Sequence, residues 1–128
     1  MSEAVGLTGL QLAILQVLWD RGEATTQDVW EAVSEERPLA LTTVATLLSR
    51  LERKHVVAHR QEGRQYVYTA TVTRAEVRRS KIQELTDTLF GGDSAALVSH
   101  LVRADDVNAE ELERIRALLD EAEARADA

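Results

Sequence analysis

The sequence predicts a mainly α-helical protein with one small β-hairpin. Three observations support this prediction. The 128 residues include only one proline and six glycines, and apolar residues recur at helical spacing along most of the chain. Over one stretch the apolar residues instead alternate with a period of two residues, which is typical of β-strands. With 45% hydrophobic and 29% charged residues, the composition is typical of a folded globular chain. The chain has no cysteine, which excludes disulfides, thiolate metal sites and cysteine nucleophiles.

The first predicted helix ends at about Arg21 and has apolar residues on two faces. Thr8 and Gln11 have the spacing of a capping box that opens the helix, and Gly22 is placed to end it. One face holds Leu10, Ile14, Val17 and Leu18, and the other holds Leu12, Leu15 and Trp19. A helix that is apolar on both sides is expected to be buried on both sides.

A second, shorter helix is predicted between Thr25 and Pro38. Thr25 and Asp28 again have capping-box spacing, and the apolar positions that follow are Val29, Trp30 and Val33. This helix must end before Pro38, because proline disfavours helical backbone at the residue before it. Both tryptophans of the chain stand beside other apolar residues at helical positions, so we expect them to pack in the core.

The third helix, from about Leu41 to Lys54, has two faces of different chemistry. Its core-facing stripe is Val44, Leu47, Leu48 and Leu51. The opposite face contains hydroxyls and arginines but no acid, and it consists of Thr42, Thr43, Thr46, Ser49, Arg50 and Arg53. A solvated helix face is the alternative interpretation. Solvated faces usually mix charges of both signs, so this composition favours contact with an anion.

Residues 56–61 and 66–70 alternate at a period of two and predict the hairpin, with residues 62–65 as its loop. Three helices followed by a hairpin is the order of a winged helix-turn-helix domain, which we assign to residues 1–72. In that arrangement the third helix enters the major groove of DNA and the hairpin lies along the backbone or the minor groove. The hairpin adds Arg60 and Arg64 to the predicted DNA contacts. Tyr66 and Tyr68 could stack on bases, but packing on the core is the preferred interpretation.

The net charge of −7 hides an uneven distribution. Residues 37–81 contain ten basic and three acidic side chains, a net of +7, whereas the rest contains five basic and nineteen acidic ones, a net of −14. The basic middle of the chain favours a nucleic-acid partner. We also expect the basic residues from Arg74 to Lys81 to bind phosphates.

Residues 73–128 predict three more helices, which begin near Thr73, Asp93 and Asn108 and are broken at Gly91-Gly92. Each has only a thin apolar stripe, which is too little for a core of its own, so we expect a second copy of the chain to cover them. The predicted dimerisation residues are Ile82, Leu85, Leu89, Phe90, Leu97, Leu101, Leu112, Ile115 and Leu119.

No spaced catalytic motif is present, so neither an enzyme activity nor a cofactor is expected. His55 and His59 are four residues apart, but a helix-to-strand transition falls between them. Surface histidines are therefore preferred over metal ligands, and no metal site is predicted. No apolar run is long enough for a membrane span and no basic start leads into one, so we expect a cytoplasmic protein without direct membrane binding.

Several segments resemble the penicillinase repressor family, of the BlaI/MecI type, and the resemblance runs from about Leu7 to Leu119. In the C-terminal half they are residues 89–93 (LFGGD), 96–98 (ALV) and 108–112 (NAEEL), and in the N-terminal half Trp19-Asp20, residues 43–51 (TVATLLSRL) and 66–68 (YVY). The resemblance implies a homodimeric bacterial repressor that binds a two-fold symmetric operator. It also implies an N-terminal winged helix and a C-terminal helical dimer region.

The resemblance further implies which residues act and how repression ends. Thr43, Thr46 and Arg50 match positions at which the family contacts DNA, and Thr42 occupies a position that is often basic. Members of the family are released when a membrane-bound β-lactam sensor triggers cleavage in the dimer region. The matching bond here is His100-Leu101, where characterised members have asparagine and then phenylalanine. A winged helix that binds proteins instead of DNA is the alternative function.

Overall fold

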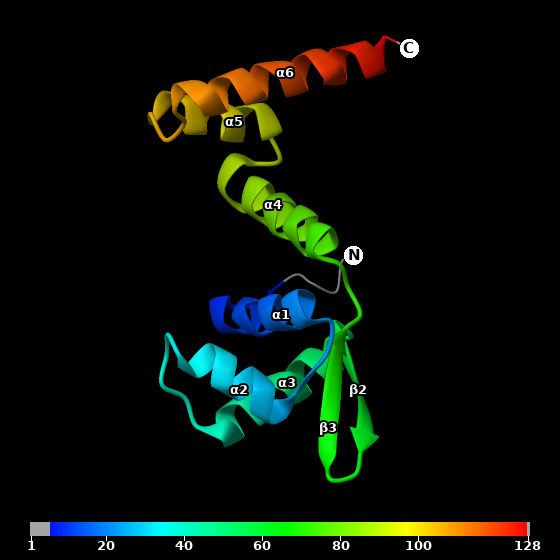
Figure 1. Ribbon diagram of the computed structural model, residues 1–128. Coiled ribbons are helices and arrows are strands. Elements are labelled where there is room, and N and C mark those ends of the chain that lie inside the picture. The colour runs from blue at the N-terminus through cyan, green and yellow to red at the C-terminus, as the bar shows by residue number, and fades with distance from the viewer. Residues whose placement is uncertain (1–5, 128) are drawn as a thin grey trace. The chain divides into compact units, whose positions relative to one another are not determined.

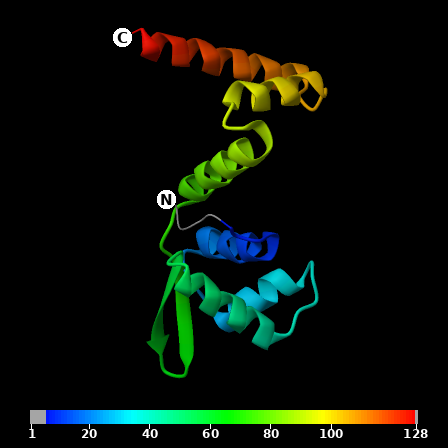
Figure 2. The ribbon, with the colours of Figure 1, turned by 180° about the vertical axis from the view of Figure 1, so that it is seen from behind.

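The computed structural model describes residues 6–127, and the chain divides into two compact units, one ending at Glu84 and the other beginning at Leu85. The first unit contains α1 (Gly9–Arg21), α2 (Thr26–Ser34) and α3 (Leu41–Arg53), together with a small antiparallel sheet. In both ribbon views the hairpin lies beside these three helices (Figures 1 and 2). The predicted winged helix-turn-helix order is confirmed.

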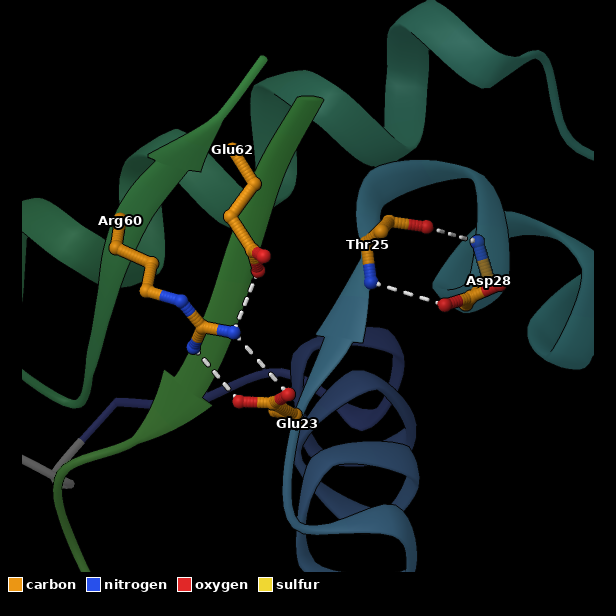
Figure 3. Close-up of polar contacts among 5 residues, drawn as sticks. All are labelled: Glu23, Thr25, Asp28, Arg60 and Glu62. Atoms are coloured by element: carbon orange, nitrogen blue, oxygen red, sulfur yellow. Dashed lines mark hydrogen bonds and ion pairs between the residues drawn. The ribbon is translucent and has the colours of Figure 1, made fainter. Parts of the chain in front are cut away.

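The predicted caps of the first two helices are both present. The Thr8 hydroxyl accepts a hydrogen bond from the Gln11 amide at 3.2 Å, while the Gln11 side chain accepts one from the Thr8 amide at 3.0 Å. Thr25 and Asp28 make the same reciprocal pair at 3.0 and 3.1 Å (Figure 3). Each box satisfies two amides that a helix start leaves without partners.

The sheet has three strands, in the order β1-β3-β2, where the sequence predicted two. The hairpin strands β2 (Val57–Glu62) and β3 (Gln65–Ala70) pair out to Glu62 and Gln65, so the loop has two residues and not the expected four. Gly63 in that loop has a φ of +62°, a conformation that glycine adopts without strain. The additional strand, β1 (Ala24–Thr25), pairs with β3 and is too short to produce an alternating pattern.

The core lies between the three helices and the sheet. Fully buried side chains come from α1, α2, α3 and the bend before β2, and the largest are Ile14, Leu15, Leu18, Leu48, Leu51, Val29, Val44 and Val56. Trp19 and Trp30 pack against this core while partly buried, and their indole N–H groups donate to the carbonyls of Val72 and Leu39. The expected burial of α1 on two sides is confirmed.

Helix α4 (Arg74–Phe90) begins in the first unit, where its first residue contacts α1. Arg74 donates to Asp20 at 2.8 Å and to Gln16 at 2.9 Å, and Val77 lies buried in the core. Lys81 donates to the carbonyl of Leu7 at 2.6 Å. These contacts do not support the expectation that Arg74 and Lys81 bind phosphates, because both cations are engaged inside the protein.

The second unit consists of the end of α4 with α5 (Ser94–Arg103) and α6 (Ala109–Ala126). Asp93 caps α5 by accepting the Ala96 amide, and Asn108 forms a capping box with Glu111 at the start of α6, so the predicted helix starts are confirmed. Neither α5 nor α6 has a buried residue. Among the described residues, no helix is long and apolar enough to cross a membrane.

Candidate nucleic-acid interface

The exposed face of α3 is the face predicted to contact an anion. Thr42, Thr43, Thr46, Ser49, Arg50 and Arg53 are all exposed, whereas Val44, Leu48 and Leu51 on the other side have no exposed surface. The hydroxyl of Thr46 donates to the carbonyl of Thr42 at 3.0 Å. The predicted amphipathic character of this helix is confirmed.

The N-terminus of α3 is open to a ligand. Its N-cap residue, Ala40, makes no side-chain hydrogen bond, and the first turn contains no acid. By contrast, α1, α2, α5 and α6 all begin with a side-chain cap. The first amides of α3 therefore keep unsatisfied donors at the positive end of the helix dipole.

Arg50, Arg53 and Arg64 are free cations in this unit. Within residues 6–127, none of the three forms an ion pair. Arg50 and Arg53 lie in the last turn of α3, and Arg64 lies in the hairpin loop. One shallow depression joins that loop to the starts of α2 and α3, and it is lined by Thr25, Thr26, Gln27, Leu41, Arg64, Gln65 and Tyr66. The hairpin tip and α3 therefore present one continuous surface.

Arg60 differs from the other predicted contacts because it is already paired. Its guanidinium donates to both carboxylate oxygens of Glu23, at 2.7 and 3.2 Å, and also to Glu62 (Figure 3). Hydrogen bonds from Arg60 hold the pKa of Glu23 below its ordinary value, and hydrogen bonds to Glu23 and Glu62 raise the pKa of Arg60 above its own. His59 faces α3, where it contacts Glu52. Neighbouring residues on a strand point to opposite faces, so Arg60 points away from α3.

A groove runs between α3 and the hairpin on the face that His59 occupies. Its lining residues are Thr26, Ala45, Ser49, Glu52, Arg53, His55, His59, Tyr66 and Tyr68. Nδ1 of His59 lies 2.6 Å from a carboxylate oxygen of Glu52, and its ring stacks on Tyr66 with centroids 4.2 Å apart. Sequence reasoning missed this cluster, because nothing in the local pattern links Glu52 on the helix to residues of the hairpin.

The two tyrosines of the hairpin have different surroundings. Tyr68 is 5% exposed, and burial, with a smaller effect from Glu52, raises the pKa of its hydroxyl. Tyr66 is 44% exposed, so the expectation that it packs in the core is wrong. Tyr66 lies beside the hairpin loop, one pair from its closing residues Glu62 and Gln65, whereas Tyr68 lies further along β3 opposite Ala24 of β1. Among the described residues, no group of three or more His, Cys, Asp or Glu side chains could hold a metal ion.

Most of the predicted dimerisation residues are exposed. Leu85, Leu89, Leu101, Leu112 and Leu119 of the second unit are between 38% and 67% exposed, as is Ile82 at 55%, whereas Phe90, Leu97 and Ile115 are half-buried. The His100-Leu101 bond lies within α5, where the carbonyl of His100 accepts the Ala104 amide at 3.0 Å. The ring of His100 also lies edge-on to Phe90, with centroids 6.1 Å apart.

This architecture and sequence are shared with known repressors. The family model described as Penicillinase repressor matches residues 7–121. The transcriptional regulator BlaI of Mycobacterium tuberculosis is 34% identical over 126 residues, covering 97% of this chain and 90% of the relative. The penicillinase repressor of Bacillus licheniformis is 23% identical over 121 residues and 94% of both chains.

A solved structure supports the assignment at the level of the fold. The solution structure of the monomeric form of B. licheniformis BlaI in complex with the blaP half-operator has a TM-score of 0.51 and 26% identity, covering 59% of this chain and 93% of that one. The family match spans nearly the whole chain. The chain therefore belongs to the penicillinase repressor family.

Proposed function

We propose that this chain is a transcriptional repressor that binds a two-fold symmetric operator as a homodimer. The observation that carries the proposal is the exposed face of α3, where small hydroxyl side chains stand beside two unpaired arginines and no acid. The homologous repressor whose structure was solved with a half-operator has the same fold. A regulator and not an enzyme is the function that this surface supports.

Recognition would divide between bases and phosphates. With α3 in the major groove, Thr42, Thr43, Thr46 and Ser49 offer hydroxyl and methyl groups to base edges, and Arg50 can donate two hydrogen bonds to a guanine. Arg53 and Arg64 are placed to meet the backbone, as are the open amides at the start of α3. Arg60 would have to give up Glu23 before it could bind a phosphate.

Dimerisation is supported by the apolar surface of the second unit. Leu89, Leu118 and Leu119 are each more than half exposed, and α5 and α6 have no buried residue. Full burial of one such side chain contributes about 1.5–3 kcal/mol to the free energy of association. We therefore infer that a second copy of the chain buries this surface. Two copies would place their α3 helices in successive major grooves, about 34 Å apart.

Control of β-lactam resistance genes is the regulatory role that we propose. The relatives are named for penicillinase and methicillin resistance. A membrane-bound sensor protease would end repression by triggering cleavage at His100-Leu101. That bond lies inside α5, and proteases bind extended backbone, so α5 would have to unwind before it is cut.

The proposal is tested by measuring how the full-length protein binds DNA from upstream of its own gene. Fluorescence anisotropy of the labelled DNA reports the binding. Specific binding should have a steep salt dependence, with a slope of about −0.9 for each phosphate neutralised. Arg50→Ala should cost about 1–3 kcal/mol and relax specificity at one base pair. Arg21→Ala is the control, since Arg21 lies at the end of α1. Absence of specific binding would favour a winged helix that binds proteins.

A further inference from the structure

We propose that His59 is a positioning residue that fixes the hairpin against α3 and so sets the geometry of the DNA-binding surface. The inference rests on the proposed function and deepens it. His59 on β2 reaches two other elements: its Nδ1 hydrogen-bonds to Glu52 on α3, and its ring stacks on Tyr66 of β3. Because a carboxylate only accepts hydrogen bonds, Nδ1 must carry the proton.

The geometry of the bridge is specific. The 2.6 Å separation between Nδ1 and the Glu52 oxygen is that of a short, strong hydrogen bond. The rings of His59 and Tyr66 are inclined by 21°, and Tyr68 stands 5.5 Å away at a steeper angle. One imidazole is therefore held by a helix on one side and by the neighbouring strand on the other.

The bridge matters because the two halves of the DNA-binding surface must act together. Arg50 and Arg53 lie on α3, whereas Arg64 lies at the hairpin tip. β1 pairs with β3 only at Val67 and Tyr68, and the Arg60–Glu23 pair holds the other face of β2. A hairpin tip that moved beyond these contacts would lose conformational entropy when it bound DNA. Holding it in place beforehand lowers this cost.

His59 also acts on the charge of α3. Glu52 is the one acid in the sequence of this helix, and its side chain is 37% exposed beside Arg53 and Ser49 in the same groove. An unpaired carboxylate there would repel a phosphate backbone. The hydrogen bond from His59 holds the Glu52 carboxylate toward the hairpin, and the imidazole N–H stabilises its negative charge.

Two substitutions separate the hydrogen bond from the ring. His59→Asn keeps a donor near the position of Nδ1, whereas His59→Phe keeps the stacked ring and removes the donor. Losing a charge-assisted hydrogen bond that positions the surface should weaken operator binding about tenfold in His59→Phe. His59→Asn should stay within about threefold of the wild type. Circular dichroism confirms that each variant is folded.

A matched control comes from the other histidine of the groove. His55 lines the same groove, and within residues 6–127 its side chain has no hydrogen bond or ion pair. Its φ is +63°, a conformation that asparagine tolerates, so His55→Asn removes an imidazole without disturbing the backbone. This variant should bind the operator as the wild type does.

A double-mutant cycle with Glu52→Ala completes the test. If the bridge positions the hairpin, His59→Phe should lose about tenfold in the wild-type background and less than threefold once Glu52 is absent. Equal losses in both backgrounds, or a loss in His55→Asn as large as in His59→Phe, would overturn the positioning role. Normal operator binding by His59→Phe would overturn it and leave the proposed function intact. Failure of the wild type to bind DNA would overturn both.

Discussion

The guanidinium of Arg74 lies 5.3 Å from the centre of the Trp19 ring and donates to Asp20 at 2.8 Å. Arg74 therefore contacts three groups: the ring of Trp19, the carboxylate of Asp20 and the side-chain amide oxygen of Gln16. Because Arg74 is the first residue of α4 and the other groups belong to α1, this contact attaches the start of α4 to the winged helix.

Replacing Arg74 should therefore destabilise the first unit. Arg74→Ala removes an ion pair that is partly exposed and a cation–π contact, so we expect a loss of about 1–2 kcal/mol in the free energy of unfolding. Urea denaturation measures it, and Arg78→Ala, on the exposed surface of the same helix, serves as the control. Equal stability of the two variants would show that Arg74 contributes nothing to this attachment.

The Glu23–Arg60 pair predicts a dependence of stability on pH. Arg60 lowers the pKa of Glu23 in the folded state, so this pair stabilises the fold above the unfolded pKa of about 4.5, and the contribution is lost as the pH falls through the lower folded value. Glu23→Gln should be less stable than the wild type at pH 7, with the difference disappearing in acid. Urea midpoints measured from pH 7 to pH 2 report it.

Glu35→Gln is the control for that titration. The Glu35 side chain is exposed and forms no ion pair within residues 6–127. Its midpoints should follow those of the wild type throughout. A Glu23→Gln variant whose deficit persisted unchanged below the folded pKa would show that the deficit has a cause other than charge.

The apolar surface of α6 predicts the oligomeric state. Leu119 is 56% exposed, and Leu119→Arg would place a charge in a face that we propose is buried against a second copy. Sedimentation should find the wild type as a dimer at concentrations where Leu119→Arg is a monomer. Glu121→Arg, two residues further along the helix and off that face, introduces the same side chain and should remain a dimer.

The cap of α5 predicts how readily the His100-Leu101 bond is cut. Asp93 accepts the Ala96 amide at 3.1 Å, and loss of such a cap costs about 1 kcal/mol of helix stability. Asp93→Ala should therefore be cleaved about five times faster at this bond by thermolysin, a protease that cuts before leucine, with fragments identified by mass spectrometry. Asp106→Ala, in the loop after α5, is the control; equal rates for both would show that α5 need not unwind.

Local patterns in the sequence predicted the helices well, because their determinants lie three or four residues apart. The boxes at Thr8 and Thr25 and the stripe from Val44 to Leu51 are of this kind. Contacts between distant segments could not be predicted in the same way. Glu23 meets Arg60 across 37 residues, so an arginine predicted to contact DNA also forms an ion pair that no local pattern indicates.

The candidate site was predicted in part for the same reason. The composition of α3 identified its exposed face, since one helix carries the whole pattern. The bridge from His59 to Glu52 depends on how the chain turns at His55, whose left-handed backbone no pattern indicates. Strand β1 was missed because two residues, Ala24 and Thr25, are too few to show a period.

All buried apolar side chains among the described residues precede Glu84, the last residue of the first unit. A cut in α5 therefore leaves the winged helix with its complete core. What such a cut would remove is the covalent tether that makes binding of the second half-site intramolecular. Tethered modules gain 10²- to 10⁴-fold in apparent affinity from effective concentration alone. Loss of bivalent binding would be enough to release the repressor from the operator, even though each winged helix stays folded.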